Sequence, residues 1–203
     1  MKIVFCWSDL SGYMAACWRS LAARDGVDVH VLAYGSSGQT AFSAKLMDGL
    51  SWTALDERER EDADHILGLV RREEPDVIVL PGWMNRAYVR LTKAPELTRV
   101  AFAMGMDTPW RGTPRQHLAR IALRRYLSRI SAVVVPGERA WQFARRLGLP
   151  DDRIHRGMYG VDWNGLGAAA FARAENTWPR SFLFAGRYAE EKGVDTLVEA
   201  YQI

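Results

Sequence analysis

The chain has 203 residues, of which 48% are apolar and 25% are charged, as is ordinary for a globular protein. Its length suits one medium α/β domain, or one domain and part of another. The net charge is only +3, the two cysteines lack metal-site spacing, and no window approaches the roughly 20 apolar residues of a membrane span, so we expect a cytoplasmic protein without a metal.

Short apolar runs alternate with stretches of helical periodicity along the chain. The apolar runs predict strands at residues 2–7, 27–32, 76–80, 100–104 and 132–135, with a further extended segment at 154–159. Helical spacing predicts helices at residues 13–24, 62–74, 114–129 and 139–147, and leaves 40–55 ambiguous. Repeated strand–helix–strand units with strands apolar on both faces predict an α/β fold, a Rossmann-like parallel sheet with helices on both faces.

The carboxyl ends of the predicted strands are rich in glycine, serine, aspartate and tryptophan. Parallel sheets of this kind bind ligands beyond these ends, so the composition suits a polar cleft with aromatic walls. Trp83 and Trp110 follow two of the strands and could stack on sugar rings, or fill the core. The amides of Gly12 and Tyr13 open a helix and could meet an anion, although a plain tight turn explains them equally well.

Residues 166–180 interrupt the alternation, because they are first alanine-rich and then polar. We interpret them as a linker between a first domain at residues 1–165 and the start of a second at 181–203. This last part holds one predicted strand, starting at Phe182, and one predicted helix, ending at Tyr201. One strand and one helix cannot form a second core, so either the second domain is cut short or this unit docks on the first.

A phosphate-binding pattern joins this last strand to its helix. Gly186 permits an unusual backbone angle, Arg187 offers a fork of donors, and Lys192 adds a compact positive charge near a helix start. The combination suits a diphosphate, while a solvated basic turn is the simpler alternative.

Residues 182–201 resemble the start of the donor domain in the group 1 family of retaining glycosyltransferases, which have the GT-B fold. The shared positions are Gly186, Arg187, Lys192, Gly193, Leu197, Ala200 and Tyr201. Residues 133–138 and 148–162 also resemble that family, which commonly has Asn-Gly-Val-Asp where this chain has Tyr159-Gly160-Val161-Asp162. The whole chain therefore resembles the N-terminal part of such an enzyme.

The resemblance implies transfer of a sugar, of the hexosyltransferase type, from a nucleoside-diphosphate sugar to a glycan or lipid-linked acceptor, as in polysaccharide biosynthesis. It implies that Arg187 and Lys192 stabilise the leaving diphosphate, and that Gly186 and Gly12 help to hold the donor. The first domain would bind the acceptor through Ser11, Tyr13, Trp83, Asp107 and Trp110. The family's paired glutamates would lie beyond residue 203, and its first-domain histidine is absent, with Asp107 in that neighbourhood.

The predicted helix at 114–130 is basic and amphipathic, so it could lie on an anionic membrane surface or simply present solvated arginines. No basic face interleaved with aromatic residues indicates nucleic acid binding. Two other function classes stay open. One is a module that binds an acceptor or headgroup and needs a partner chain, and the other is a GT-B-like sugar-nucleotide epimerase. We expect the 203 residues alone to be inactive in transfer.

Overall fold

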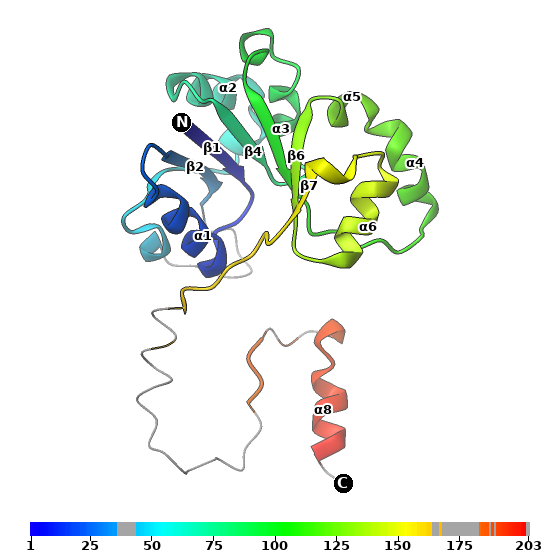
Figure 1. The fold of residues 1–203 in the computed structure, drawn as a ribbon. Helices are drawn as coiled ribbons and strands as arrows, with labels where there is room; N and C mark the ends of the chain where they lie inside the picture. Colours follow the sequence, from blue (N-terminus) through cyan, green and yellow to red (C-terminus); the bar gives the residue numbers. More distant parts are fainter. Residues whose placement is uncertain (36–43, 164–166, 168–182, 187, 189, 202–203) are drawn as a thin grey trace. The chain divides into compact units, whose positions relative to one another are not determined.

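The computed structural model describes residues 1–35, 44–163, 167, 183–186, 188 and 190–201 (Figure 1). The chain divides into two compact units, Met1–Asp162 and Trp163–Ile203, which we describe separately. Apart from residue 167, the predicted linker at 166–180 lies outside the described residues, as does Arg187.

Within the described residues, one sheet of seven parallel strands forms the centre of the first unit, in the order β3-β2-β1-β4-β5-β6-β7. The strands are β1 Lys2–Trp7, β2 Asp28–Tyr34, β3 Ser51–Leu55, β4 Val77–Leu80, β5 Ala101–Gly105, β6 Ile130–Val135 and β7 Ile154–Arg156. The predicted Rossmann-like α/β fold is therefore confirmed.

The α-helices of the first unit are α1 Gly12–Ala22, α2 Ala63–Arg72, α3 Arg86–Leu91, α4 Pro114–Ala122, α5 Arg124–Leu127 and α6 Glu138–Arg146. The first unit also contains short 3-10 turns, of which the last follows α6: η1 Ala44–Met47, η2 Glu59–Glu61, η3 Pro95–Leu97 and η4 Asp151–Arg153. The second unit contains η5 Glu190–Lys192 and α8 Val194–Tyr201. No helix within the described residues is long and apolar enough to cross a bilayer.

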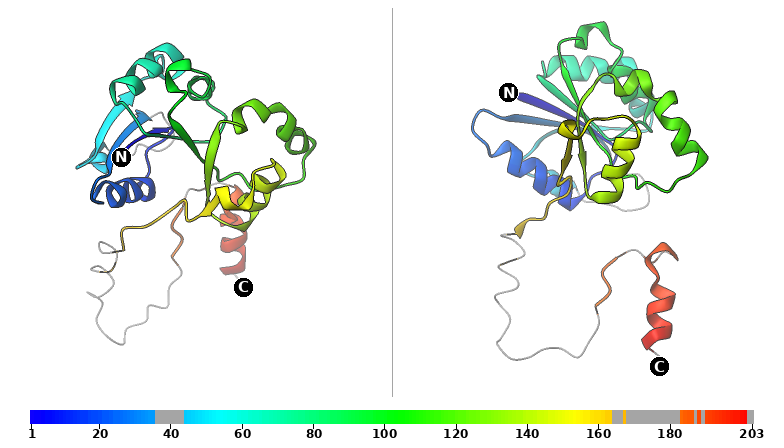
Figure 2. Two further views of the ribbon diagram at one scale, coloured as in Figure 1. Left: turned by 45° about the horizontal axis from the view of Figure 1, so that its top comes forward. Right: turned by 45° about the vertical axis from the view of Figure 1, so that its right-hand side comes forward.

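The two faces of the sheet carry different helices (Figures 1 and 2). Crossovers between parallel strands are right-handed, and the chain runs from β1 to β3 in one direction and from β4 to β7 in the other. Consequently α1 packs on one face, where Trp18 contacts Phe5. Helices α2, α3, α5 and α6 share the core of the opposite face, centred on residues such as Phe102.

The predicted helix at 114–129 is wrong in one respect, because the structure divides it into α4 and α5. Leu123 has φ −94° and ψ 1°, which is not helical. The break turns Tyr126 and Leu127 into the core, where they are 4% and 8% exposed. The ambiguous stretch 40–55 yields η1 and β3, so it holds both a turn of helix and a strand.

The second unit confirms the predicted helix as α8, but its described residues 183–185 belong to no strand. A strand is defined by hydrogen bonds to a neighbouring strand, and the structure provides none for these residues. Phe182, where the predicted strand begins, lies outside the described residues.

Candidate functional site

A cavity of about 660 Å³ lies at the carboxyl ends of β4 and β5, and we call it the strand-end cavity. Its walls come from the loops after both strands, from the start of α4 and from one residue of α6. They are Pro81, Gly82, Trp83, Met84, Gly105, Met106, Asp107, Thr108, Pro109, Arg111, Thr113, Arg115, Gln116, Ala119 and Phe143. The cavity therefore brings together two of the predicted acceptor residues, Trp83 and Asp107.

The local sequence explains how these loops are held. The Tyr126 hydroxyl donates to the carbonyl of Gly82 at 2.6 Å and fixes the loop after β4. The Thr113 hydroxyl accepts from the amide of Gln116 at 3.3 Å and starts α4, with Pro114 in its first turn. The Gln116 side chain in turn donates to the carbonyl of Pro109 at 2.9 Å. The cavity wall is thus built from capped and hydrogen-bonded segments.

Beside this cavity, Asp107 belongs to a small polar and aromatic cluster with Tyr159 and Tyr13. The Tyr159 hydroxyl donates to Oδ2 of Asp107 at 2.9 Å. The rings of Tyr159 and Tyr13 meet edge to face, with their centroids 4.8 Å apart. Burial, and then the hydrogen bond to Asp107, raises the pKa of Tyr159 above its usual value, so the hydroxyl stays a donor and orients the carboxylate.

The sequence analysis treated Tyr159 only as a departure from the family's usual asparagine, and it missed the contact with Asp107. The chain after β7 crosses the carboxyl edge of the sheet, where the amide of Met158 donates to the carbonyl of Val135 at 3.3 Å. A tyrosine at the end of the predicted extended segment 154–159 was the available signal, because all carboxyl ends of the strands of a parallel sheet meet at one edge.

The two candidate tryptophans differ in their surroundings. Trp83 is half-buried, lines the strand-end cavity and packs edge-on against Phe143, with centroids 6.0 Å apart. Trp110 contacts the same Phe143 at 5.5 Å, and the Arg146 guanidinium lies over its ring at 4.7 Å. His117 packs edge-on against it at 4.9 Å. Trp110 therefore supports the wall to which Trp83 belongs.

Ser11 and Gly12 lie at the start of α1. Ser11 is 6% exposed, and its hydroxyl accepts from the amide of Met14 at 3.4 Å, so it caps the helix. A side chain at Gly12 would meet no heavy atom closer than Leu46 at 4.0 Å. Among the described residues there is thus room beside Gly12 at the start of α1, where unpaired backbone amides of a helix can meet a ligand.

The second unit places Gly186 and Lys192 on exposed segments. Lys192 is the last residue of η5, and Gly193 separates it from the start of α8, with φ +62°. The positive Lys192 side chain therefore lies at the N-terminus of α8, where its own charge and the positive end of the helix dipole both favour an anion. Within the described residues, no group of His, Cys, Asp and Glu side chains could hold a metal ion.

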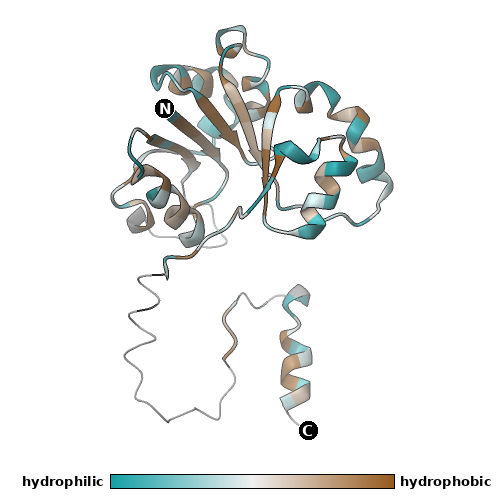
Figure 3. Cartoon of the chain, in the orientation of Figure 1, coloured by the Kyte–Doolittle hydropathy of each residue, from teal (hydrophilic) through white to brown (hydrophobic). Residues whose placement is uncertain are grey.

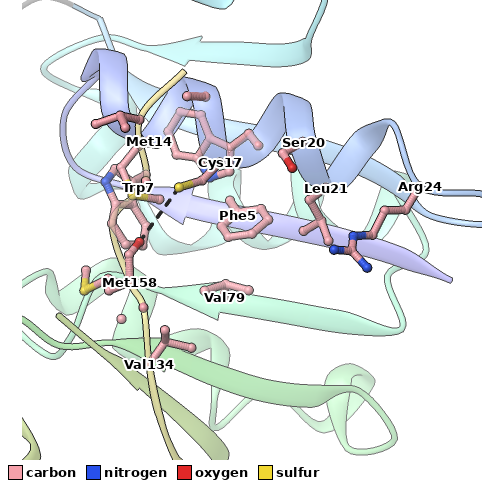
Figure 4. Close-up of a pocket in the computed structure, with 16 residues that line it drawn as sticks. Phe5, Trp7, Met14, Cys17, Ser20, Leu21, Arg24, Val79, Val134 and Met158 are labelled. Carbon is pink, nitrogen blue, oxygen red and sulfur yellow. Dashed lines mark hydrogen bonds between the residues drawn. The ribbon is translucent and has the colours of Figure 1, made fainter. Parts of the chain in front are cut away.

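A second cavity, of about 510 Å³, lies on the α1 face of the sheet (Figure 4). Phe5, Val79 and Val134, on β1, β4 and β6, form its floor, and Cys17 and Leu21 of α1 line it from above. The Cys17 thiol donates weakly to the carbonyl of Met158 at 4.0 Å. Its lining is mainly apolar, so the polar groups suited to sugar chemistry belong to the strand-end cavity instead.

Comparison with solved structures supports the fold. The structure is similar to a glycosyltransferase from Rickettsia africae ESF-5 at 14% identity and a TM-score of 0.56, over 99% of this chain and 49% of that one. It is similar to UDP-GlcNAc 2-epimerase from Neisseria meningitidis bound to UDP-GlcNAc at 9% identity and a TM-score of 0.55, over 77% and 46% of the two chains. Anabaena Alr3699/HepE in complex with UDP and glucose gives 17% identity and a TM-score of 0.53, over 81% and 46%.

The chain thus spans about half the length of these proteins, and identities this low show the fold alone. No curated protein matches the sequence. Residues 11–160, well over half of the chain, match the family described as "Glycosyl transferase 4-like domain". The matched region includes the strand-end cavity together with Tyr13 and Tyr159. This match confirms the resemblance to the N-terminal part of a GT-B glycosyltransferase, and the chain belongs to the glycosyl transferase 4-like family.

Proposed function

We propose that the first unit is the acceptor-binding half of an enzyme that transfers a sugar, with retention, from a nucleoside-diphosphate sugar to an acceptor hydroxyl. The observation that carries the proposal is the hydrogen-bonded Asp107, oriented by Tyr159 at the mouth of a cavity walled by Trp83. A fixed carboxylate beside an aromatic wall suits a sugar, because the carboxylate accepts from hydroxyls while the ring covers an apolar sugar face.

The donor side of the proposal rests on the second unit. Arg187 and Lys192 would neutralise the charge that builds on the leaving diphosphate, as oxyanion-stabilising groups do in other transfers. Gly186 and Gly12 would leave room for the phosphates to approach the backbone. Several similar structures contain UDP or a UDP-sugar, which supports a nucleotide-sugar donor for this chain as well.

The remaining candidates have supporting roles in the proposal. Tyr13 presents a 48% exposed ring beside Tyr159 and would contact the acceptor directly. Ser11 and Trp110 would act through the elements that they hold, namely the start of α1 and the wall behind Trp83.

The test is to measure transfer by the full natural protein carrying Asp107→Asn, with Asp152→Asn as a matched control. Loss of the carboxylate should raise the KM for the acceptor at least tenfold while the KM for the donor changes little. Asp152 is exposed in η4, before β7 and therefore at the opposite edge of the sheet, so the control should behave like the parent. Unchanged acceptor kinetics in Asp107→Asn would contradict the assignment of this cavity to the acceptor.

An epimerase is the second candidate, because the similar structures include a UDP-GlcNAc 2-epimerase. Such an enzyme would convert a sugar nucleotide without any acceptor. Incubating the full protein with UDP-sugars alone and following the sugar by NMR separates the two, since a transferase leaves the sugar's configuration at C2 unchanged. A third possibility, a binding module with a partner chain, predicts that activity returns only when the partner is added.

A further inference from the structure

Helix α4 turns its two large aliphatic side chains, Leu118 and Ile121, toward solvent instead of toward the core. None of its residues is buried, and Leu118 and Ile121 are 62% and 75% exposed. Their spacing of three places both on the same side of the helix. Figures 1 and 2 show α4 at the outer edge of the first unit. A helix of a globular domain ordinarily buries its apolar stripe, so this outward one indicates a surface with a partner.

The charge around α4 has one sign. Residues 108–137 contain six arginines and no aspartate or glutamate. Arg129 is used inside the fold, because it donates to the carbonyls of Thr92 and Leu97. The other five are exposed, and within the described part of the chain none of them forms an ion pair: Arg111, Arg115, Arg120, Arg124 and Arg125.

Exposed arginines occur elsewhere on the first unit as well. Arg145 pairs with Asp151 at 2.9 Å and Arg156 pairs with Glu138 at 2.7 Å, whereas Arg72 and Arg90 are exposed without a described ion pair. What sets the region around the exposed apolar stripe apart is that its five exposed arginines lie in a stretch of the sequence without any acidic residue.

A groove of about 430 Å³ adjoins this stripe, between α4, α5 and the turn after α6. Three arginines line it, Arg120, Arg124 and Arg153, and no acidic residue does. Gly148 lets Arg120 lie close against the turn, because a side chain there would begin 3.2 Å from Nε of Arg120. Three guanidinium groups around a small groove suit a phosphate headgroup.

We propose that α4 and α5 form a docking surface for an anionic lipid bilayer. Leu118 and Ile121 enter the boundary between headgroups and acyl chains, while the arginines meet lipid phosphates and the groove takes one headgroup. A nucleic acid fits less well, because exposed Leu118 and Ile121 are aliphatic and cannot stack on bases as aromatic side chains do.

The same helix links this surface to the strand-end cavity. Gln116 and Ala119 line the cavity, whereas Leu118 and Ile121 on α4 are exposed to solvent. Docking would therefore hold the cavity mouth beside the bilayer. Resting on the proposed function, this favours a lipid-linked acceptor over a soluble glycan.

The test is co-sedimentation of the 203-residue chain with phosphatidylcholine vesicles, with and without phosphatidylglycerol. We expect binding only to vesicles that contain phosphatidylglycerol. This binding should be lost as the salt concentration rises from about 0.1 M to about 1 M, because the screening length then falls from about 10 Å to about 3 Å. Leu118→Gln/Ile121→Gln should weaken binding at least about tenfold. Arg124→Gln/Arg125→Gln should weaken it about fivefold for each arginine.

The matched control is Arg72→Gln/Arg90→Gln, which removes the same charge from exposed positions on α2 and α3. It should bind like the parent chain, and circular dichroism should show that every variant is folded. No binding to anionic vesicles, or equal weakening by the control, would overturn the proposal. The assay contains no sugar donor, so its failure would leave the proposed transfer standing.

Discussion

Replacing Gly105 with alanine should destabilise the first unit, because this position has no room for a side chain. A methyl group there would lie 2.7 Å from Cη2 of Trp7 and 3.0 Å from Cε of Met158. Carbon atoms in contact are normally about 3.5–4.0 Å apart, so the indole must move by about 1 Å. Trp7 is 8% exposed and packs against Trp18, with centroids 6.2 Å apart, so that movement disturbs the core.

Overpacking of this kind costs about 1–3 kcal/mol of unfolding free energy. For a chain of this size, about 2 kcal/mol corresponds to about 4–8 °C in Tm. Urea and thermal unfolding followed by tryptophan fluorescence would measure the change. Because Met158 precedes Tyr159, we also expect the displaced segment to weaken acceptor binding in the full protein.

The matched control is Gly68→Ala, in the interior of α2, where an added methyl would meet no heavy atom within 4 Å. It should stabilise the chain by about 0.5–1 kcal/mol, because alanine favours helix over glycine. If Gly105→Ala unfolded at the same urea concentration as the parent while Gly68→Ala behaved as expected, the claim that Trp7 packs tightly against Gly105 would be refuted.

Three further predictions concern the donor, pH and the isolated chain. Arg187→Ala/Lys192→Ala should lower kcat of the full protein at least about a hundredfold, comparable to removing an oxyanion donor. Unchanged turnover would remove both residues from the site. Burial lowers the pKa of His30, which contacts Ser51 and Thr53 at 2.7 and 3.0 Å, so the folded state favours the neutral ring. The contribution of His30 to the free energy of unfolding is therefore present above its unfolded pKa of about 6.5 and is lost as the pH falls below that value. The urea midpoint should accordingly fall between pH 8 and pH 5 in the parent through this group, and this fall should be missing in His30→Gln. The 203 residues alone should give no detectable sugar transfer, and measurable transfer by the purified chain would contradict that expectation.

The sheet could be predicted from the sequence because its strands are apolar on both faces. Residues such as Val79 and Ile78 alternate between two covered faces of β4, which gives an uninterrupted apolar run. Hydropathy along the chain shows the same pattern, with apolar strands and mixed helices (Figure 3). These local signals do not depend on which strands become neighbours.

The break between α4 and α5 could not be predicted in the same way. Neither glycine nor proline lies near Leu123, so no local signal ends the helix there. The cause is tertiary, because the Tyr126 hydroxyl must reach the carbonyl of Gly82, 44 positions earlier in the chain. The outward position of Leu118 and Ile121 was equally hidden, since an amphipathic pattern does not say whether its apolar side faces the core or a partner.

The candidate site shows where sequence reasoning ends and topology begins. Tyr13 and Asp107 could be placed at the carboxyl edge, because each follows a predicted strand, whereas Tyr159 only ended a predicted extended segment. Their contact depends on strand order, and Asp107 and Tyr159 are 52 positions apart. The order reverses between β1 and β4, so the chain leaves these two strands toward opposite faces of the sheet, and sheets of this kind bind ligands at such a switch point.

The reversal also explains why one helix serves two purposes. Helix α4 follows β5 on the face away from α1, and its first turn borders the strand-end cavity while Leu118 and Ile121 on the same helix are exposed in the described structure. For an enzyme that takes its acceptor from a membrane, a single rigid helix that carries both the cavity wall and the membrane contact would hold the cavity at the bilayer. A variant that loses vesicle binding through Leu118 and Ile121 should therefore also lose transfer to a lipid-linked acceptor, while transfer to a short soluble analogue survives. An equal loss of transfer to both acceptors would mean that the two substitutions act through the shape of the cavity and not through membrane docking.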